Sequence, residues 1–396
     1  MTSHDQSHPP APHPAAEPLP VTVLSGFLGA GKTTVLNRLL SGRDGRRIAV
    51  IVNDMSEVNI DASLIALGGF DRTEEKLVEL TNGCICCTLR EDLHEAVGAI
   101  ARQVAPDGSR RFDHLVIEST GISEPMPVAA TFDWEFDDGR RLGDVARLDT
   151  MVTLVDCATF LTEIVRGEGL ADRDLAAADG DARSIADLLV DQVEFADVIL
   201  LTKSDLVADG VRGAVEAMVR RLNPRARILL ARRGEVPIDA ILDTGLFDHE
   251  AASAIAGWDD EVLGAAHTPE TEEYSISSVA FRSDRPFHPA RLAQALDQLG
   301  GVLRSKGFCR LATRPDIAAV WSQAGPNLTI EPAAYWDDLD GSPGQQLVLI
   351  GARLDHDRVR ELLTAATLTD AEMAEGPLGW RRYDDPLPPW PNVHTH

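Results

Sequence analysis

The sequence predicts an α/β fold in which a mostly parallel, doubly wound sheet is followed by a smaller α+β domain. Short apolar, β-branched runs alternate with segments of helical spacing from residue 21 to residue 245, and strands joined by helices pair in parallel. From residue 273 the pattern changes to several strands around two helices, at residues 289–299 and 357–368. A chain of 396 residues is long enough for two such domains.

The predicted domain boundaries follow changes in composition along the chain. Residues 1–20 are rich in Pro, Ala and His and are expected to form a disordered tail. The first domain is predicted at residues 21–245, a loop-rich linker at 246–272, and the second domain at 273–370. Residues 371–396 are Pro-rich towards their end and are expected to form a loose tail.

The composition indicates which classes of partner the protein can bind and in which cellular compartment it is expected. With 63 acidic against 37 basic residues the net charge is −26, which disfavours binding to nucleic acid or to an anionic membrane. No apolar run reaches transmembrane length and no signal peptide is visible, so a cytoplasmic protein is expected. Three of the five cysteines crowd into residues 84–87, which is not the pattern of a disulfide framework.

The first motif is a glycine-rich loop between a predicted strand and a predicted helix. It reads Gly26-x-x-x-x-Gly31-Lys32-Thr33, and this context is that of a phosphate-binding loop in a P-loop NTPase. Lys32 is expected to reach the β- and γ-phosphates, and the Thr33 hydroxyl to bind Mg²⁺. A glycine-rich turn that binds nothing is the alternative. The predicted nucleotide-binding residues of the loop are Gly26, Gly29, Ala30, Gly31, Lys32, Thr33 and Thr34.

Two further strand ends carry nucleotide-binding signals. Glu118 ends a predicted strand and could orient Mg²⁺ or its water, while Gly121 lets a backbone N–H approach the γ-phosphate. We expect Lys32, Thr33 and Glu118 to be the catalytic residues. Thr202-Lys203-Ser204-Asp205 ends another strand, where Asp205 can accept hydrogen bonds from N1–H and the exocyclic amine of guanine and the stem of Lys203 can pack on the base.

The fourth motif is Cys84-Ile85-Cys86-Cys87, whose thiolates suit soft or borderline ions such as Zn²⁺, Co²⁺ and Cu⁺. Three sulfurs leave a tetrahedral site open, as reversible delivery of a metal would require. The alternatives are a buried turn of small residues and a redox pair. Four residues are candidates for a further ligand: Glu57, Asp61, His94 and His114. Cys157 and Cys309 stand alone in apolar surroundings and are predicted to pack in the core.

Together these elements resemble the CobW-type GTPases, a P-loop family linked to metal-centre assembly. The matching residues are 26–34, 48–61, 83–87, 118–121, 202–205, 267–274 and 322–326. The later stretches look like the YciC branch, bacterial proteins associated with growth in low zinc. The resemblance covers residues 20–370, including the C-terminal domain of the family.

The resemblance implies GTP hydrolysis, Mg²⁺ at the phosphates, Zn²⁺ at the cysteine motif, and transfer of the zinc to a client metalloenzyme. From its position in the loop after the second strand, Glu57 could equally bind Mg²⁺, bind the transferred metal or face solvent. Slow intrinsic turnover is expected because no residue stands out as positioning the attacking water. Two other functions remain open: a zinc buffer or sensor with GTP as a structural ligand, which the His-bearing tails favour, and a cobalt-directed GTPase. The client and homo-oligomer formation are also open.

The sequence departs from the family pattern at two positions. Thr202 stands where the guanine motif usually begins with Asn, which alters a contact to the loop backbone but leaves Asp205 to select guanine. Val52 stands where some relatives carry an acidic metal ligand, which leaves the metal shell beyond the cysteines open.

Overall fold

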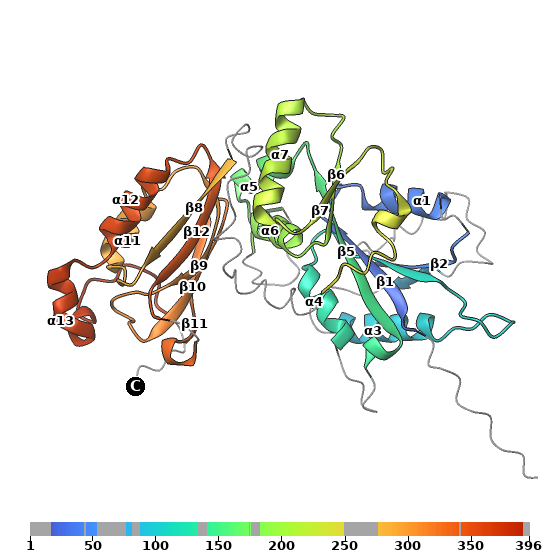
Figure 1. The fold of residues 1–396 in the computed structure, drawn as a ribbon, viewed down its shortest axis with the longest axis horizontal. Coiled ribbons are helices and arrows are strands. Elements are labelled where there is room, and N and C mark those ends of the chain that lie inside the picture. The colour runs from blue at the N-terminus through green and yellow to red at the C-terminus, as the bar shows by residue number, and fades with distance from the viewer. Residues whose placement is uncertain are drawn as a thin grey trace, which may run out of the picture.

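The computed structural model describes residues 17–42, 45–53, 77–80, 88–133, 141–173, 175, 183–248, 276–339 and 342–390. They form two sheets with helices, which lie side by side in Figure 1. Several predictions fall outside these ranges: most of the N-terminal tail, nearly all of the linker, and the candidate ligands Glu57, Asp61, Cys84, Cys86 and Cys87.

Seven of the described strands form the N-terminal sheet, and every pairing between them is parallel. Their order is β3-β2-β4-β1-β5-β6-β7, so β2, β3 and β4 lie on one side of β1, with β4 next to it, and β5 to β7 follow in order on the other. This confirms the predicted doubly wound sheet. The strands are β1 (Leu19–Gly26), β2 (Ile48–Asn53), β3 (Leu77–Leu80), β4 (His114–Glu118), β5 (Ala146–Asp156), β6 (Val198–Thr202) and β7 (Arg227–Ala231).

Helices cover both faces of this sheet because its strands are apolar on both sides. On one face α1 packs with Leu24, Val50 and Val116 through its own Leu36. The opposite face carries α3 to α7 in two apolar clusters. No helix in the described ranges has both the length and the hydrophobicity needed to cross a membrane. The helices are α1 (Lys32–Ser41), α3 (Thr88–Ala101), α4 (Pro125–Ala130), α5 (Phe160–Arg166), α6 (Ile185–Glu194) and α7 (Asp209–Leu222).

Five described strands form the antiparallel C-terminal sheet, in the order β11-β10-β9-β12-β8. Helices α11 and α12 pack on the face that lies away from the N-terminal sheet (Figure 1), around the buried ring of Trp321. The predicted α+β architecture is therefore confirmed. Its elements are β8 (Ile276–Ser283), α11 (Pro289–Leu296), β9 (Val302–Cys309), β10 (Ile317–Ala324), β11 (Asn327–Tyr335), β12 (Gln345–Ala352) and α12 (His356–Ala366).

The chain beyond residue 370 differs from the loose tail expected there. It begins with a further helix, α13 (Asp370–Trp380), whose N-terminus is fixed by a capping box between Thr369 and Glu372. Trp380 ends this helix 4% exposed and donates from Nε1 to the Glu372 carbonyl oxygen, 2.7 Å away. The helical conformation is interrupted at Gly376, which has a φ of 67°, and Pro377 follows it, so two short helical stretches are easily mistaken for a loop in the sequence.

Glu372 links α13 to α11 and gives this contact a pH dependence. Hydrogen bonds from Arg291, at 2.8 Å to each carboxylate oxygen, lower the pKa of Glu372 from 4.5 to about 2. The stabilisation is therefore complete above pH 4.5 and is lost as the pH falls towards 2. We expect Glu372→Gln to lower the free energy of unfolding at pH 7 by about 1–2 kcal/mol and to flatten its pH dependence in this window.

Urea unfolding at several pH values measures this effect. Glu361→Gln is the matched control, because Glu361 lies on α12 with 70% of its side chain exposed and 3.8 Å from Arg358. An equal loss of stability in the two variants at pH 7 would contradict a specific role for the Glu372–Arg291 pair.

Candidate functional site

The glycine-rich loop joins β1 to α1 as predicted. Gly26 has a φ of 138°, and a Cβ at this position would lie 2.7 Å from the carbonyl oxygen of Leu154 on β5, so only glycine fits. Gly31 begins α1 in the left-handed region, with a φ of 102°. Lys32 Nζ donates to the Gly26 carbonyl oxygen at 2.6 Å, which holds the ammonium group inside the loop where phosphate oxygens could bind. The remaining residues predicted to bind the nucleotide lie in the same turn or in the first turn of α1: Gly29, Ala30, Thr33 and Thr34.

A hydroxyl and a carboxylate meet beside the loop. Glu118 is the last residue of β4, its side chain is buried, and it pairs in register with Leu24 of β1. Thr33 Oγ1 donates to Glu118 Oε1 across 3.4 Å. Oxygen ligands of these two kinds, together with phosphate oxygens, are those that Mg²⁺ prefers in proteins. The arrangement fits a magnesium ion bound between the loop and β4.

The segment after β4 runs close against the phosphate-binding loop. A Cβ on Gly121 would lie 2.8 Å from the backbone nitrogen and 2.5 Å from Cδ2 of Leu28. Any side chain at this position would therefore displace the loop. The close approach brings the backbone of Gly121 to the edge of the nucleotide site, where its N–H could reach a γ-phosphate.

The predicted guanine-reading residues follow β6 at the same edge of the sheet. Thr202 Oγ1 donates to the carbonyl oxygen of Ala30 at 2.8 Å, so the threonine links this motif to the phosphate-binding loop by its hydroxyl. Lys203 adopts a left-handed conformation with a φ of 53°. Two residues later, Asp205 is exposed and able to accept hydrogen bonds from a base.

Asp156, the last residue of β5, belongs to this site but to none of the motifs recognised in the sequence. Its Oδ2 accepts from Lys203 Nζ at 2.7 Å, and its Oδ1 accepts from the backbone N–H of Ala158 at 2.9 Å. Asp156 therefore holds the lysine stem where a base would stack on it. An acidic residue that ends a strand beside the phosphate-loop strand is the signal that could have identified it.

The cysteine motif lies outside the described residues, but the elements on either side of it are described. β3 ends at Leu80, at the sheet edge where β1 and β4 also end, and α3 begins at Thr88. Within the described part of the chain, no group of three or more His, Cys, Asp or Glu side chains could hold a metal ion.

The candidate ligand His114 has contacts at both ring nitrogens within the N-terminal domain. It begins β4, at the end of the parallel sheet opposite to the one where β3 ends at Leu80. Its Nε2 is 2.9 Å from Thr22 Oγ1 and its Nδ1 is 3.3 Å from Asp243 Oδ1. Burial lowers the pKa of His114 despite the carboxylate, so the ring is a neutral structural histidine.

His94 lies on α3, seven residues after Cys87, with its side chain buried. Burial, and to a lesser extent Arg102, lowers its pKa, which favours the neutral ring that a metal requires. It remains a candidate ligand. Cys157 and Cys309 are buried in apolar clusters, which confirms the prediction that both pack in the core. Burial raises their pKa values to about 11 and about 12, so both are neutral thiols.

Comparison with known proteins agrees with this geometry. Residues 20–230 match the family described as "CobW/HypB/UreG, nucleotide-binding domain", and residues 276–367 match the "Cobalamin synthesis protein cobW C-terminal domain". The chain belongs to the CobW/HypB/UreG family. With a complete phosphate-binding loop and the guanine motif at one sheet edge, this CobW protein is a GTPase.

Two curated relatives resemble this chain over most of its length. The "Zinc-regulated GTPase metalloprotein activator 1" of Dictyostelium discoideum is 44% identical over 94% of this chain and 84% of its own. The "Zinc chaperone CobW" of Sinorhizobium sp is 30% identical over 88% of this chain and 97% of its own. Among solved structures, Zn(II)-bound YjiA GTPase from E. coli is 22% identical, with a TM-score of 0.41 over 89% of this chain and 100% of its own.

Proposed function

We propose that this CobW-family GTPase is a cytoplasmic zinc metallochaperone. The thiolates of Cys84, Cys86 and Cys87 bind Zn²⁺, GTP hydrolysis changes the affinity of that site, and a client metalloprotein receives the ion. The curated relatives named as a zinc-regulated metalloprotein activator and as a zinc chaperone support this function.

One structural observation carries the proposal. β3 ends at the edge of the sheet where β1 and β4 end, and only β2 separates β3 from β4. Residues that follow β3 therefore begin two strands away from Glu118, so a change at the γ-phosphate has a short path to the cysteine motif. Loss of phosphate contacts on hydrolysis commonly reorganises such neighbouring loops.

Each residue of the site has its own role in nucleotide binding or hydrolysis. Lys32 neutralises charge on the β- and γ-phosphates, and the Gly121 N–H donates to the γ-phosphate. Thr33 and Glu118 would hold Mg²⁺, which would supply positive charge to balance the negative charge that develops on the phosphates. Asp205 selects guanine, with Lys203 packed on the base and Asp156 and Thr202 holding the motif in place.

The test is the zinc affinity of the protein with a non-hydrolysable GTP analogue, with GDP and without nucleotide, by competition with a chromophoric chelator. We expect the affinity to differ between the nucleotide states by about 5-fold or more, and the difference to vanish when Cys84, Cys86 and Cys87 are replaced by Ser. Cys309→Ala is the control, because this buried thiol has no access to the metal.

Three outcomes would overturn the proposal. Equal zinc affinity in all nucleotide states would indicate a buffer rather than a GTP-driven chaperone. Loss of zinc binding on removal of residues 1–18, with the cysteines intact, would assign the ion to the histidine tail. Tighter and nucleotide-dependent binding of Co²⁺, with Zn²⁺ insensitive to nucleotide, would indicate a cobalt chaperone.

A further inference from the structure

Helix α6 contacts the segment that follows β4, which runs along the nucleotide site. Gln192 Nε2 donates to the carbonyl oxygen of Ser123 across 3.2 Å. Just before the helix, Arg183 Nη1 donates to Glu124 Oε1 at 2.6 Å. Ser123 and Glu124 lie two and three residues after Gly121, so the segment that packs against the phosphate-binding loop is also hydrogen-bonded to α6 and to a residue just before it.

The last residue of α6 binds the C-terminal sheet through a buried ion pair. Glu194 accepts from Arg304 of β9, with Nε at 2.8 Å from one carboxylate oxygen and Nη2 at 3.2 Å from the other. Only 4% of either side chain is exposed. Arg304 Nη1 also donates to Ser322 Oγ at 2.9 Å and to the carbonyl oxygen of Gln323 at 3.1 Å, both on β10. Separating such a pair leaves buried charge without a partner, so α6 and the two strands move together.

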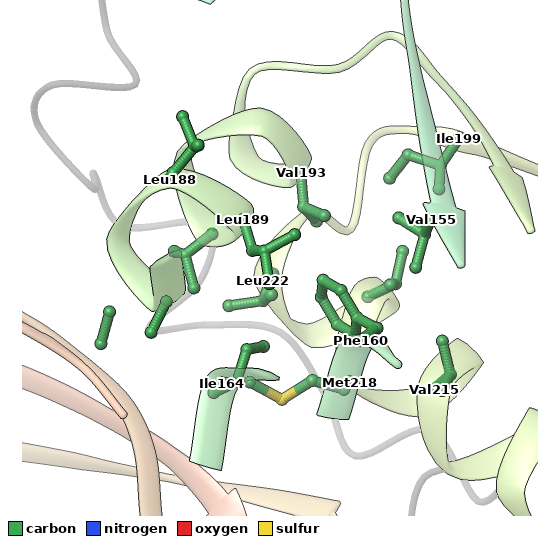
Figure 2. Packing of buried hydrophobic residues seen from close by; sticks show 14 of the residues in the cluster. Val155, Phe160, Ile164, Leu188, Leu189, Val193, Ile199, Val215, Met218 and Leu222 are labelled. Carbon is green, nitrogen blue, oxygen red and sulfur yellow. The ribbon is translucent and has the colours of Figure 1, made fainter. Parts of the chain in front are cut away.

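Apolar packing makes the same connection. One cluster of buried residues contains Ile122 from the segment after β4, Leu188 and Leu189 from α6, and Val348 and Ile350 from β12. Figure 2 shows Leu189 and Val193 of α6 on the side of the helix that faces labelled side chains of α5, α7 and β5. A core this continuous transmits displacement because it has few voids to absorb it.

Gln192 also provides an unused acceptor at this junction. Its side chain is buried, and Oε1 has no hydrogen-bond partner among the described residues. Its backbone carbonyl accepts from Thr153 Oγ1 at 2.7 Å, which fixes this turn of the helix to β5. If the segment shifts at Ser123, the Gln192 side chain could lose its hydrogen bond from Nε2 and form one at Oε1 instead.

We infer that α6 couples the nucleotide bound at the N-terminal sheet to the position of the C-terminal sheet, with Gln192 positioning the segment after β4 and the Glu194–Arg304 ion pair carrying its movement to β9 and β10. A γ-phosphate that draws the Gly121 N–H towards it moves this segment and with it α6. Because coupling is reciprocal, a partner that shifts the C-terminal sheet changes the preference for GTP over GDP. The C-terminal sheet is thus a regulatory domain of the GTPase, whatever metal the protein carries.

The test compares the full-length protein with the double variant Glu194→Met/Arg304→Met. An apolar pair replaces both ions, so neither Glu194 nor Arg304 is left alone. Lys306, whose Nζ is 3.7 Å from Glu194 Oε2, loses this contact but is 17% exposed and keeps access to solvent, and thermal unfolding checks that the fold is retained. Dissociation constants for a fluorescent GTP analogue and for GDP are measured without zinc, so the result is independent of metal delivery. We expect the ratio of the two constants to change by about 5-fold or more.

Asn327→Ala is the matched control. Asn327 Nδ2 also crosses between the sheets and donates to the carbonyl oxygen of Gly167 at 3.0 Å, but this hydrogen bond reaches the residue that ends α5 rather than α6. This variant should leave the ratio unchanged. In the wild type, hydrogen exchange of the β9 and β10 amides should differ between the GTP-analogue and GDP states, and the difference should disappear in the double Met variant.

Gln192→Leu is made both in the wild type and in the double Met variant, which gives a double-mutant cycle between Gln192 and the ion pair. It should change the nucleotide ratio in the wild type and have little further effect once the ion pair is gone, because both changes break the same connection. Additive effects, an unchanged ratio in the double Met variant, or an equal change in Asn327→Ala would each overturn the inference.

Discussion

Replacing Asp205 by Asn is expected to weaken GTP binding by about 10²- to 10⁴-fold, since each of two hydrogen bonds to a charged acceptor contributes about 1.5–3 kcal/mol. The carboxylate accepts from both N1–H and the exocyclic amine of guanine, whereas an amide must present an N–H to one of these donors. Xanthine carries an oxygen where guanine has the amine, so the amide of Asn matches it. The variant should therefore hydrolyse XTP in place of GTP.

Nucleotide titrations and steady-state hydrolysis with GTP, XTP and ATP measure this change of base specificity from guanine to xanthine. Asp209→Asn is the control, since Asp209 is an exposed carboxylate that begins α7 and pairs with Arg212 at 3.0 Å. It should bind GTP as the wild type does. If Asp205→Asn retained full GTP affinity, or lost GTP without gaining XTP, Asp205 would not be the residue that reads the base.

The elements that could be predicted from sequence are those whose signals are local. The turn from β1 to α1 was predicted because its glycines, lysine and threonine lie within eight consecutive residues. Gly26 and Gly31 have positive φ angles, a conformation that glycine adopts without steric cost. The sheet was predicted for a similar reason, since each strand is a continuous apolar run that helices cover on both faces.

The features that sequence reasoning missed depend on pairs of residues far apart in the chain. Glu194 and Arg304 are 110 positions apart, and each alone resembles an ordinary surface charge. Asp156 acquires its role only because β5 and β6 pair in register and bring it to Lys203. His114 was a candidate ligand because the sequence alone does not reveal its contacts with Thr22 and Asp243, which lie 92 and 129 positions away in the chain.

Gly121→Ala is expected to lower the rate of GTP hydrolysis by about 10²-fold, comparable to removing one backbone donor from a developing charge. The added Cβ would lie 2.5 Å from Leu28 Cδ2 and 2.8 Å from the Leu28 backbone nitrogen. The side chain of Leu28 is 49% exposed and can rotate away, but the backbone of the phosphate-binding loop has to move. Single-turnover hydrolysis and GTP-analogue binding measure the two consequences separately.

Two companion variants isolate the backbone contact as the cause. Adding Leu28→Ala to Gly121→Ala removes the clash with the side chain only, so activity should recover in small part and remain well below that of the wild type. Gly210→Ala is the matched control, because a Cβ there has no atom within 4 Å and an alanine inside α7 is expected to stabilise the protein by about 0.5–1 kcal/mol. Full recovery in the double variant would show that the Leu28 side chain alone requires glycine at position 121. Normal hydrolysis by Gly121→Ala would separate this segment from the nucleotide site, and with it the proposed starting point of the movement that α6 carries to the C-terminal sheet.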